Sequence, residues 1–493
     1  MAFDPTATTL DETRQRIADR SVSATEVMQS YLDRIETHDG DLGTYEEVWV
    51  DRALDRAGAV DRGEITGPLA GVPIAIKALF CTENGTTTAS SRMLDGYRSP
   101  FTATCIARLE SAGAVIVGKT RMDEFAMGSS GETSYLGPTR NPWDPQRVPG
   151  GSSSGSAAAM AADLCAGAIG SDTGGSIRQP AALCNVVGLK PTYGRVSRWG
   201  MVAFASSLDQ AGPLTHSVKD AALLLSAMSG ADARDSTCAD VPVPGDLAEV
   251  DVSPGPIRLG LPKQYFGTGN TSDVEAAMDR ARAIYQQEGV ELIEIDLPHT
   301  DYGIPVYYIV ATAEASSNLA RYDGIHYGHR SQATDDLVEL YAASRSEGFG
   351  DEVKRRIMLG TYSLASGYYD AYYNRALKVR RLIRQDFDRA FEQCDAVLCP
   401  TTPGPAFKLG AKTDDPLAMY LNDIYTVNAP LAGLPALSMP GGMDQSEGKV
   451  LPIGVQLIGQ PFDEARLLRI ARLFERNTDF NHQRPALSTT HSA

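Results

Sequence analysis

The chain has 493 residues, of which 43% are hydrophobic and 22% are charged, and its formal net charge at pH 7 is −17. This composition excludes an intrinsically disordered chain and predicts a folded protein with a large core. The negative charge disfavours direct contact with a nucleic-acid backbone, so any role with nucleic acid requires a partner that binds it.

Two helices are predicted near the start of the chain, and the second is amphipathic. Thr9 with Glu12, and Ser23 with Glu26, have the spacing of a capping box, in which a hydroxyl and a glutamate satisfy free amides at a helix N-terminus. The first residues show no basic and apolar leader, and no stretch reaches the roughly 18 apolar residues of a membrane span. Seven cysteines without metal-ligand spacing indicate reduced thiols. We therefore expect a cytoplasmic protein with no membrane contact.

From residue 69 onward, short apolar runs alternate with helical stretches. A strand is predicted at 72–76, a helix at 101–111 that stops before Gly113, and a strand at 114–117. The later elements continue this alternation, with strands at 257–261, 290–295, 396–398 and 453–458 and helices at 272–288 and 462–476. The pattern predicts an α/β fold in which a large mixed β-sheet is flanked by helices on both faces.

Residues 305–390 differ from the rest because they are rich in tyrosine and arginine and contain no convincing strand. We expect them to form a helical cap over the sheet, within a single domain that spans residues 1–493. The composition of residues 235–254 indicates a surface loop.

Two segments rich in serine and glycine, residues 150–156 and 171–180, indicate a site of acyl transfer. A serine hydroxyl is a weak nucleophile at neutral pH, so a base must accept its proton. The histidines fit this role poorly, because only His216 lies near these segments and none has a G-x-S-x-G partner pattern. Lys77 fits better, since it ends the apolar run 71–77, where burial would lower the pKa of an amine.

Ser152 is placed to pass a proton between Lys77 and Ser176, and Gly174 and Gly175 leave the backbone amides before Ser176 open to a substrate oxygen. Each feature alone has a simpler explanation: a surface lysine at a strand end, a glycine-rich turn or anion-binding nest, and a flexible linker or phosphate loop. The phosphate loop is disfavoured because its G-K-[ST] ending is missing, and the linker because the segment runs directly into a predicted alanine-rich helix.

Taken together, Lys77, Ser152 and Ser176, with the block 149–180 around the serines, resemble the amidase signature family. The resemblance implies that Ser176 attacks an amide, that Ser152 follows a cis non-proline peptide bond and relays the proton, and that Lys77 is the base. The oxyanion hole that it implies is the backbone of Thr173, Gly174 and Gly175.

The resemblance extends over nearly the whole chain and is closest to the glutamine-hydrolysing subunits of tRNA-dependent amidotransferases. The stretches that carry it lie at 124–130, 188–198, 205–210 and 314–321. It implies that glutamine is hydrolysed through a glutamyl ester on Ser176, with release of ammonia. The implied pocket pairs the α-carboxylate of glutamine with Arg356 and its α-ammonium with Asp423, and its further walls are Tyr307, Gly128 and Ser129.

The same resemblance implies two partner subunits and neither a cofactor nor a metal in this chain. A larger B subunit would use ATP and Mg²⁺ and bind the tRNA, and a small C subunit would steady the pair. The amidated substrate, Glu-tRNA(Gln), Asp-tRNA(Asn) or both, depends on that partner. A free-standing amidase that acts on aryl, fatty or peptide amides remains an alternative. A scaffold without activity is disfavoured, because all three catalytic positions carry competent side chains.

Overall fold

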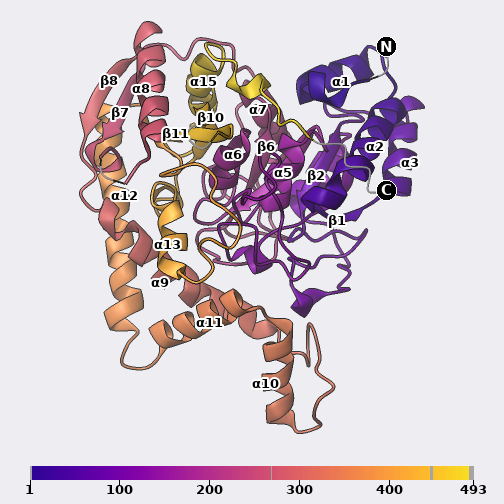
Figure 1. Ribbon diagram of the computed structural model, residues 1–493, viewed down its shortest axis with the longest axis vertical. Helices are drawn as coiled ribbons and strands as arrows, with labels where there is room; N and C mark the ends of the chain where they lie inside the picture. Colours follow the sequence, from indigo (N-terminus) through magenta and orange to yellow (C-terminus); the bar gives the residue numbers. More distant parts are fainter. Residues whose placement is uncertain (1–2, 268, 445–447, 488–493) are drawn as a thin grey trace.

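The computed structural model describes residues 3–267, 269–444 and 448–487 (Figure 1). In this part of the chain, eleven strands form one mixed sheet in the order β1-β3-β2-β4-β6-β5-β10-β11-β9-β7-β8. The strands are β1 (Tyr45–Val48), β2 (Pro73–Lys77), β3 (Val115–Thr120), β4 (Gly167–Asp172), β5 (Val187–Lys190), β6 (Gln210–Thr215), β7 (Arg258–Pro262), β8 (Glu291–Ile295), β9 (Ala396–Pro400), β10 (Ala436–Asp444) and β11 (Leu451–Gly459).

The sheet has two parallel parts on either side of an antiparallel centre, and its edge strand β1 pairs antiparallel with β3. β2 runs parallel to β3 and β4, and β7 runs parallel to β8 and β9. The central strands β4, β6, β5, β10, β11 and β9 pair antiparallel in that order. The predicted α/β class and its mixed sheet are confirmed.

Fifteen α-helices surround the sheet within the described residues. They are α1 (Leu10–Ala18), α2 (Ala24–Leu42), α3 (Val50–Asp61), α4 (Thr104–Ser111), α5 (Ser154–Ala161), α6 (Arg178–Cys184), α7 (Val218–Met228), α8 (Ser272–Gln287), α9 (Gly303–Asn318), α10 (Leu337–Gly348), α11 (Asp351–Leu364), α12 (Arg375–Gln393), α13 (Pro416–Tyr420), α14 (Asn428–Leu431) and α15 (Glu464–Glu475). α5 packs on β2, β3 and β4, α6 on β5, β10 and β11, and α8 and α15 on β10 and β11.

Most predicted elements lie within a few residues of their observed bounds, but the structure differs from the prediction in three respects. The helix predicted at 101–111 begins at Thr104. Thr9 and Glu12 form the full capping box, whereas Ser23 caps the N–H of Glu26 without the reciprocal bond. Five strands were not predicted: β1, β4, β5, β6 and β10. β4 reads Gly-Ala-Ile-Gly-Ser-Asp and is buried throughout, so it shows neither the alternation nor the β-branched run that marks a strand.

Residues 305–390 contain helices and connecting loops but no strand, and they include most of α9, all of α10 and α11, and most of α12. α9 packs against α11 and α12, and α10 projects at the bottom of the view in Figure 1. All seven cysteines carry free thiols, and residues 235–254 form turns and bends as expected for a loop. Among the described residues, every helix is too short or too polar to cross a membrane.

Candidate active site

Lys77 is the last residue of β2, and its side chain is fully buried. Its amine donates hydrogen bonds to three serine hydroxyls, at 2.8 Å to Ser152, 3.0 Å to Ser153 and 2.9 Å to Ser171. Burial lowers the pKa of Lys77 to about 7, although the charges of nearby buried aspartates oppose this shift. A large fraction of the amine is therefore neutral near pH 7 and is able to accept a proton.

Ser152 lies just before α5 and follows a cis peptide bond from Gly151. Asp123 holds this turn, because its N–H donates to the Ser152 carbonyl at 3.1 Å. Its carboxylate also lies against Gly151, where an added Cβ would come within 1.9 Å of Oδ2, so the position requires glycine. The turn thus places the Ser152 hydroxyl against the amine of Lys77, and Asp123 is a supporting residue that the sequence alone did not indicate.

Ser176 follows β4, at the same edge of the sheet as the end of β2, and is 7% exposed. Its carbonyl accepts the N–H of Ser153 at 3.1 Å, which ties it to the segment that carries Ser152. The structure therefore brings Lys77 and Ser152 into contact. The Ser176 hydroxyl has no hydrogen-bond partner among the described residues, so its bond to Ser152 is not formed here. Hydrogen bonds of this kind often tighten only when substrate binds.

The loop from Thr173 to Ser176 presents free backbone amides. Within the described residues, the N–H groups of Gly174, Gly175 and Ser176 donate to no acceptor. The loop itself is firmly held, since the Thr426 hydroxyl donates to the Gly174 carbonyl at 2.6 Å. Free amides on a fixed loop are what an oxyanion hole requires.

A fully buried ion pair supports the base of this loop. Asp172 accepts from Arg178 at 2.9 Å and 3.0 Å, and both side chains are completely inaccessible to solvent. Arg178 also donates to Gln456 of β11 at 2.6 Å, so the loop is anchored to the centre of the sheet. Breaking such a pair would leave an uncompensated buried charge, so movement of the loop away from this anchor is costly.

Substitution of Gly175 tests whether the geometry of this loop is required for catalysis. Its φ is +146°, and an added Cβ would lie 2.3 Å from the Thr426 hydroxyl. We expect Gly175→Ala to lower kcat by about 100-fold, because the loop must shift and misplace its amide donors. The matched control is Gly63→Ala, which has a positive φ of +77° but meets nothing within 4 Å. A kcat for Gly175→Ala within twofold of the wild type would contradict the assignment of this loop.

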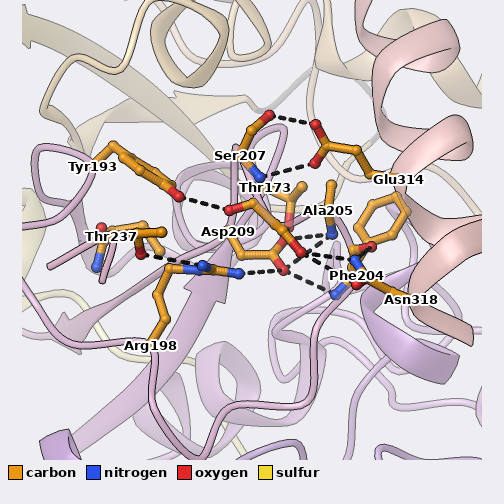
Figure 2. Close-up of polar contacts among 12 residues, drawn as sticks. Thr173, Tyr193, Arg198, Phe204, Ala205, Ser207, Asp209, Thr237, Glu314 and Asn318 are labelled. Atoms are coloured by element: carbon orange, nitrogen blue, oxygen red, sulfur yellow. Dashed lines mark hydrogen bonds and ion pairs between the residues drawn. The ribbon is translucent and has the colours of Figure 1, made fainter. Parts of the chain in front are cut away.

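A second loop, residues 204–209, connects the first to the helical region (Figure 2). Asp209 is buried and accepts the Thr173 hydroxyl at 2.7 Å together with the N–H groups of Phe204 and Ala205. Figure 2 shows the other side of the loop, where Glu314 of α9 accepts both the N–H and the hydroxyl of Ser207, at 2.8 Å and 2.6 Å. The loop therefore links α9 to the amide donors beside Ser176.

The residues predicted to bind a substrate α-carboxylate and α-ammonium are buried in one region. Arg356 of α11 is 3% exposed, and Asp423 is 5% exposed. The Ser129 hydroxyl donates to Asp423 Oδ2 at 2.5 Å. Burial raises the pKa of Asp423 to about 7, and the bond from Ser129 and the charge of Arg356 act in the opposite direction. Arg356 and Asp423 form no ion pair with each other in the described part of the chain, and Arg356 instead pairs through Nε with Glu352 at 2.8 Å.

Tyr307 and Gly128 lie at the same region. The Tyr307 ring covers Gly174, because a Cβ added there would lie 2.5 Å from Cζ of the ring. Gly128 packs on Asp123, where an added Cβ would lie 2.4 Å from the carboxyl carbon. Tyr307 thus touches the amide-donor loop directly, whereas Gly128 allows the Ser129 segment to approach Asp123.

Arg356 is held by residues that the sequence analysis did not identify. Its Nε donates to Glu352 Oε1 at 2.8 Å, and the Tyr420 hydroxyl donates to the same oxygen at 3.1 Å. The guanidinium carbon also lies 5.3–5.6 Å from the ring centroids of Phe204, Tyr308 and Tyr420. One signal was available, since Glu352 stands four residues before Arg356 on one helix face. The aromatic partners come from distant segments.

Comparison with known proteins gives a consistent result. Residues 26–468 match the family model described as Amidase. The A subunit of glutamyl-tRNA(Gln) amidotransferase from Coxiella burnetii (strain RSA 493 / Nine Mile phase I) is 54% identical over 484 residues, covering 97% of this chain and 99% of that protein. The protein of the same description from Moorella thermoacetica is 55% identical over 472 residues, or 95% and 96% of the two chains.

Two solved structures show the same fold at high coverage. The A subunit of glutamyl-tRNA(Gln) amidotransferase from Thermotoga maritima superposes with a TM-score of 0.82 at 39% identity, and the match covers 99% of each chain. The peptide amidase of Stenotrophomonas maltophilia also gives a TM-score of 0.82, at 32% identity over 98% of this chain and 99% of that one.

Proposed function

This chain belongs to the amidase family, and on that premise we propose that it is the glutamine-hydrolysing subunit of an amidotransferase that converts Glu-tRNA(Gln) to Gln-tRNA(Gln). The observation that carries this proposal is the buried pair of opposite charges, Arg356 and Asp423, in the region that also contains Tyr307 and the Ser176 loop. A free amino acid has one carboxylate and one ammonium group, and charge-assisted hydrogen bonds bind both selectively. The identity to the A subunits of amidotransferases over almost the whole chain supports the same assignment.

The reaction begins with attack of Ser176 Oγ on the γ-carboxamide carbon of glutamine. The Ser176 proton passes to Ser152 as the Ser152 proton passes to the neutral amine of Lys77. The carboxamide oxygen becomes an oxyanion, which the backbone N–H groups of the loop from Thr173 to Ser176 stabilise. The proton then returns by the same path to the amide nitrogen, the C–N bond breaks, and ammonia leaves.

The product of this first half is a glutamyl ester on Ser176. Water attacks the ester carbon and gives its proton through Ser152 to Lys77, and the same amide donors hold the second oxyanion. The C–O ester bond then breaks, glutamate leaves, and the proton returns to Ser176. Lys77 thus serves as base in both attacks and as acid in both departures, which suits a pKa of about 7.

The ammonia is proposed to pass to a larger B subunit that binds ATP, Mg²⁺ and the tRNA, with a small C subunit in the same complex. The relatives from C. burnetii, M. thermoacetica and T. maritima are each described as the A subunit of an amidotransferase, which supports such an assembly. The charge of −17 on this chain is consistent with a partner that binds the tRNA. The reconstituted enzyme should form Gln-tRNA(Gln) from Glu-tRNA(Gln), ATP and glutamine only when this chain is present. An equal rate without the chain would contradict the proposal.

Arg356→Ala separates this function from that of a free-standing amidase. We expect kcat/KM for glutamine to fall by about 100-fold, because the α-carboxylate loses a buried charged partner. Turnover of butanamide, which has neither charge, should change little. Lys354→Ala is the control, since this neighbour on α11 pairs with the exposed Asp351. Rapid hydrolysis of butanamide by the isolated chain, with glutamine turnover unchanged in Arg356→Ala, would favour an amidase like the S. maltophilia enzyme.

A further inference from the structure

Two adjacent residues of the segment before Ser129 contact two adjacent residues at the start of α11. Glu124 and Phe125 lie in the 3₁₀ turn Glu124–Ala126, and they meet Gly350 and Phe349. The contact joins parts of the chain that are more than 200 residues apart. Each part supplies one side of the proposed glutamine pocket, because Ser129 bonds Asp423 and α11 carries Arg356.

The carboxylate of Glu124 makes the polar half of this contact. It accepts the N–H of Gly350, at 2.9 Å to Oε2 and 3.2 Å to Oε1, and the hydroxyl of Ser91. Ser91 Oγ also lies 3.3 Å from the carbonyl of Gly348, the last residue of α10. Gly350 is the N-cap residue of α11, so Glu124 places a carboxylate at the positive end of that helix. An added Cβ at Gly350 would lie 2.4 Å from Oε2, which shows how closely the two segments approach.

Aromatic packing forms the apolar half of this contact. The rings of Phe125 and Phe349 lie 5.6 Å apart between centroids at an interplanar angle of 62°, which is a favourable edge-to-face arrangement. The backbone of Phe125 is left-handed, with φ of +49°, and so is that of Ala126, with φ of +61°. Such conformations are uncommon away from glycine and persist where the surrounding structure holds them. The segment is thus shaped to face α11 with both side chains at once.

Burial of the Glu124 carboxylate at this contact is energetically unfavourable. It is 2% exposed, and its partners in the contact are neutral groups. Burial raises its pKa to about 7, against the effect of its hydrogen bonds to Ser91 and Gly350. A buried carboxylate without a directly bonded cation does not add stability as an apolar side chain would, so its benefit must lie elsewhere.

We propose that Glu124 is a positioning residue for glutamine: by fixing the N-terminus of α11 to the segment that carries Ser129, it sets the position of Arg356 relative to Asp423. This inference rests on the proposed function. Arg356 is the sixth residue of α11, about 8 Å along the axis from the helix start. A small tilt at Gly350 therefore moves the guanidinium and changes the spacing of the two charges that bind the amino acid.

The test uses the complex with the partner subunits and compares glutamine with butanamide. Glu124→Ala should raise KM for glutamine by about tenfold with a smaller change in kcat, because Arg356 is displaced but not lost, which is a smaller defect than the about 100-fold loss expected from its removal. The kcat/KM for butanamide should stay within about twofold, because that substrate does not use Arg356. Glu124→Gln should return KM close to the wild-type value, since its amide oxygen still accepts the Gly350 N–H. Asp351→Asn is the matched control, because this acid begins the same helix with a side chain that is 92% exposed.

A second measurement keeps the inference testable if Glu124→Ala does not fold. Ser91→Ala removes the other donor to Glu124 and should raise KM for glutamine in the same direction by a smaller factor. In an Arg356→Ala background, Glu124→Gln and Ser91→Ala should have no further effect on glutamine turnover, because the residue through which they act is gone. Equal losses with glutamine and butanamide, or an unchanged KM for glutamine in every variant, would overturn the inference. An inactive wild type would instead overturn the proposed function.

Discussion

Replacement of Ser176 by alanine is expected to abolish glutamine-dependent amidation while leaving ammonia-dependent amidation by the assembled enzyme intact. The hydroxyl of Ser176 is the proposed nucleophile, and the loss of a nucleophile of this type lowers kcat by about 10⁴-fold or more. The loop should keep its shape in the variant, because it is held by the Asp172–Arg178 pair and the Thr426 bond rather than by the Ser176 side chain.

The assay measures Gln-tRNA(Gln) formed with glutamine and, separately, with ammonium chloride at alkaline pH. The control is Ser154→Ala, which removes a hydroxyl of α5 that bonds Thr139 and the Arg121 carbonyl and does not touch Lys77. Retention of glutamine-dependent activity in Ser176→Ala would refute the nucleophile assignment. Loss of both activities would indicate instead that the complex no longer assembles.

Removal of the Lys77 amine is the second large expected effect. We expect Lys77→Ala to lower kcat/KM for glutamine by about 10³-fold or more near pH 7, where no other group is able to take the Ser152 proton. The loss should shrink at alkaline pH, because hydroxide replaces the missing base. In the wild type, the pKa of Lys77 is lowered to about 7, so kcat/KM should rise as pH increases through 7 and then level off as the amine becomes neutral.

Two control variants isolate this effect. Lys119 is another buried lysine, on the neighbouring strand β3, and its amine donates to the Phe80 carbonyl and to Thr87 instead of the active serines. Lys119→Met should therefore preserve the pH profile. Asp423 also changes its charge near neutral pH, because burial raises its pKa to about 7. In Asp423→Asn, the increase in kcat/KM that comes from deprotonation of Lys77 should remain. A Lys77→Ala deficit that is the same at every pH would argue against lysine as the base.

The α/β class and the strand that ends at Lys77 could be predicted from the sequence, because apolar runs and helix caps are local signals. β2 was expected at 72–76 and is observed at Pro73–Lys77. β4 and β10 were not predicted from the sequence, because both contain glycines at positions where neighbouring segments approach closely. In β4, for example, a Cβ at Gly170 would lie 2.7 Å from the Ser153 hydroxyl. These glycines serve tertiary contacts, and no local pattern encodes a tertiary contact.

The residues of the candidate site also fall into two groups, those with a local signal in the sequence and those without one. Lys77, Ser152 and Ser176 stand in segments whose composition indicates their chemistry, whereas the roles of Arg356 and Asp423 were implied only by the resemblance. The burial of these two residues follows from how α11 and the segment after α13 pack in the folded chain, which no spacing in the sequence reveals. The supporting contacts of Asp123 with Gly151 and of Glu124 with Gly350 are likewise formed between segments distant in the chain.

The most direct test is to trap the covalent intermediate. The complex is mixed with glutamine, quenched in acid within a fraction of its turnover time, and digested for peptide mass spectrometry. We predict a glutamyl ester on Ser176, absent in Ser176→Ala and removed by hydroxylamine. A glutamyl group on Ser152 instead, or turnover of glutamine with no ester on either serine, would contradict the proposed mechanism.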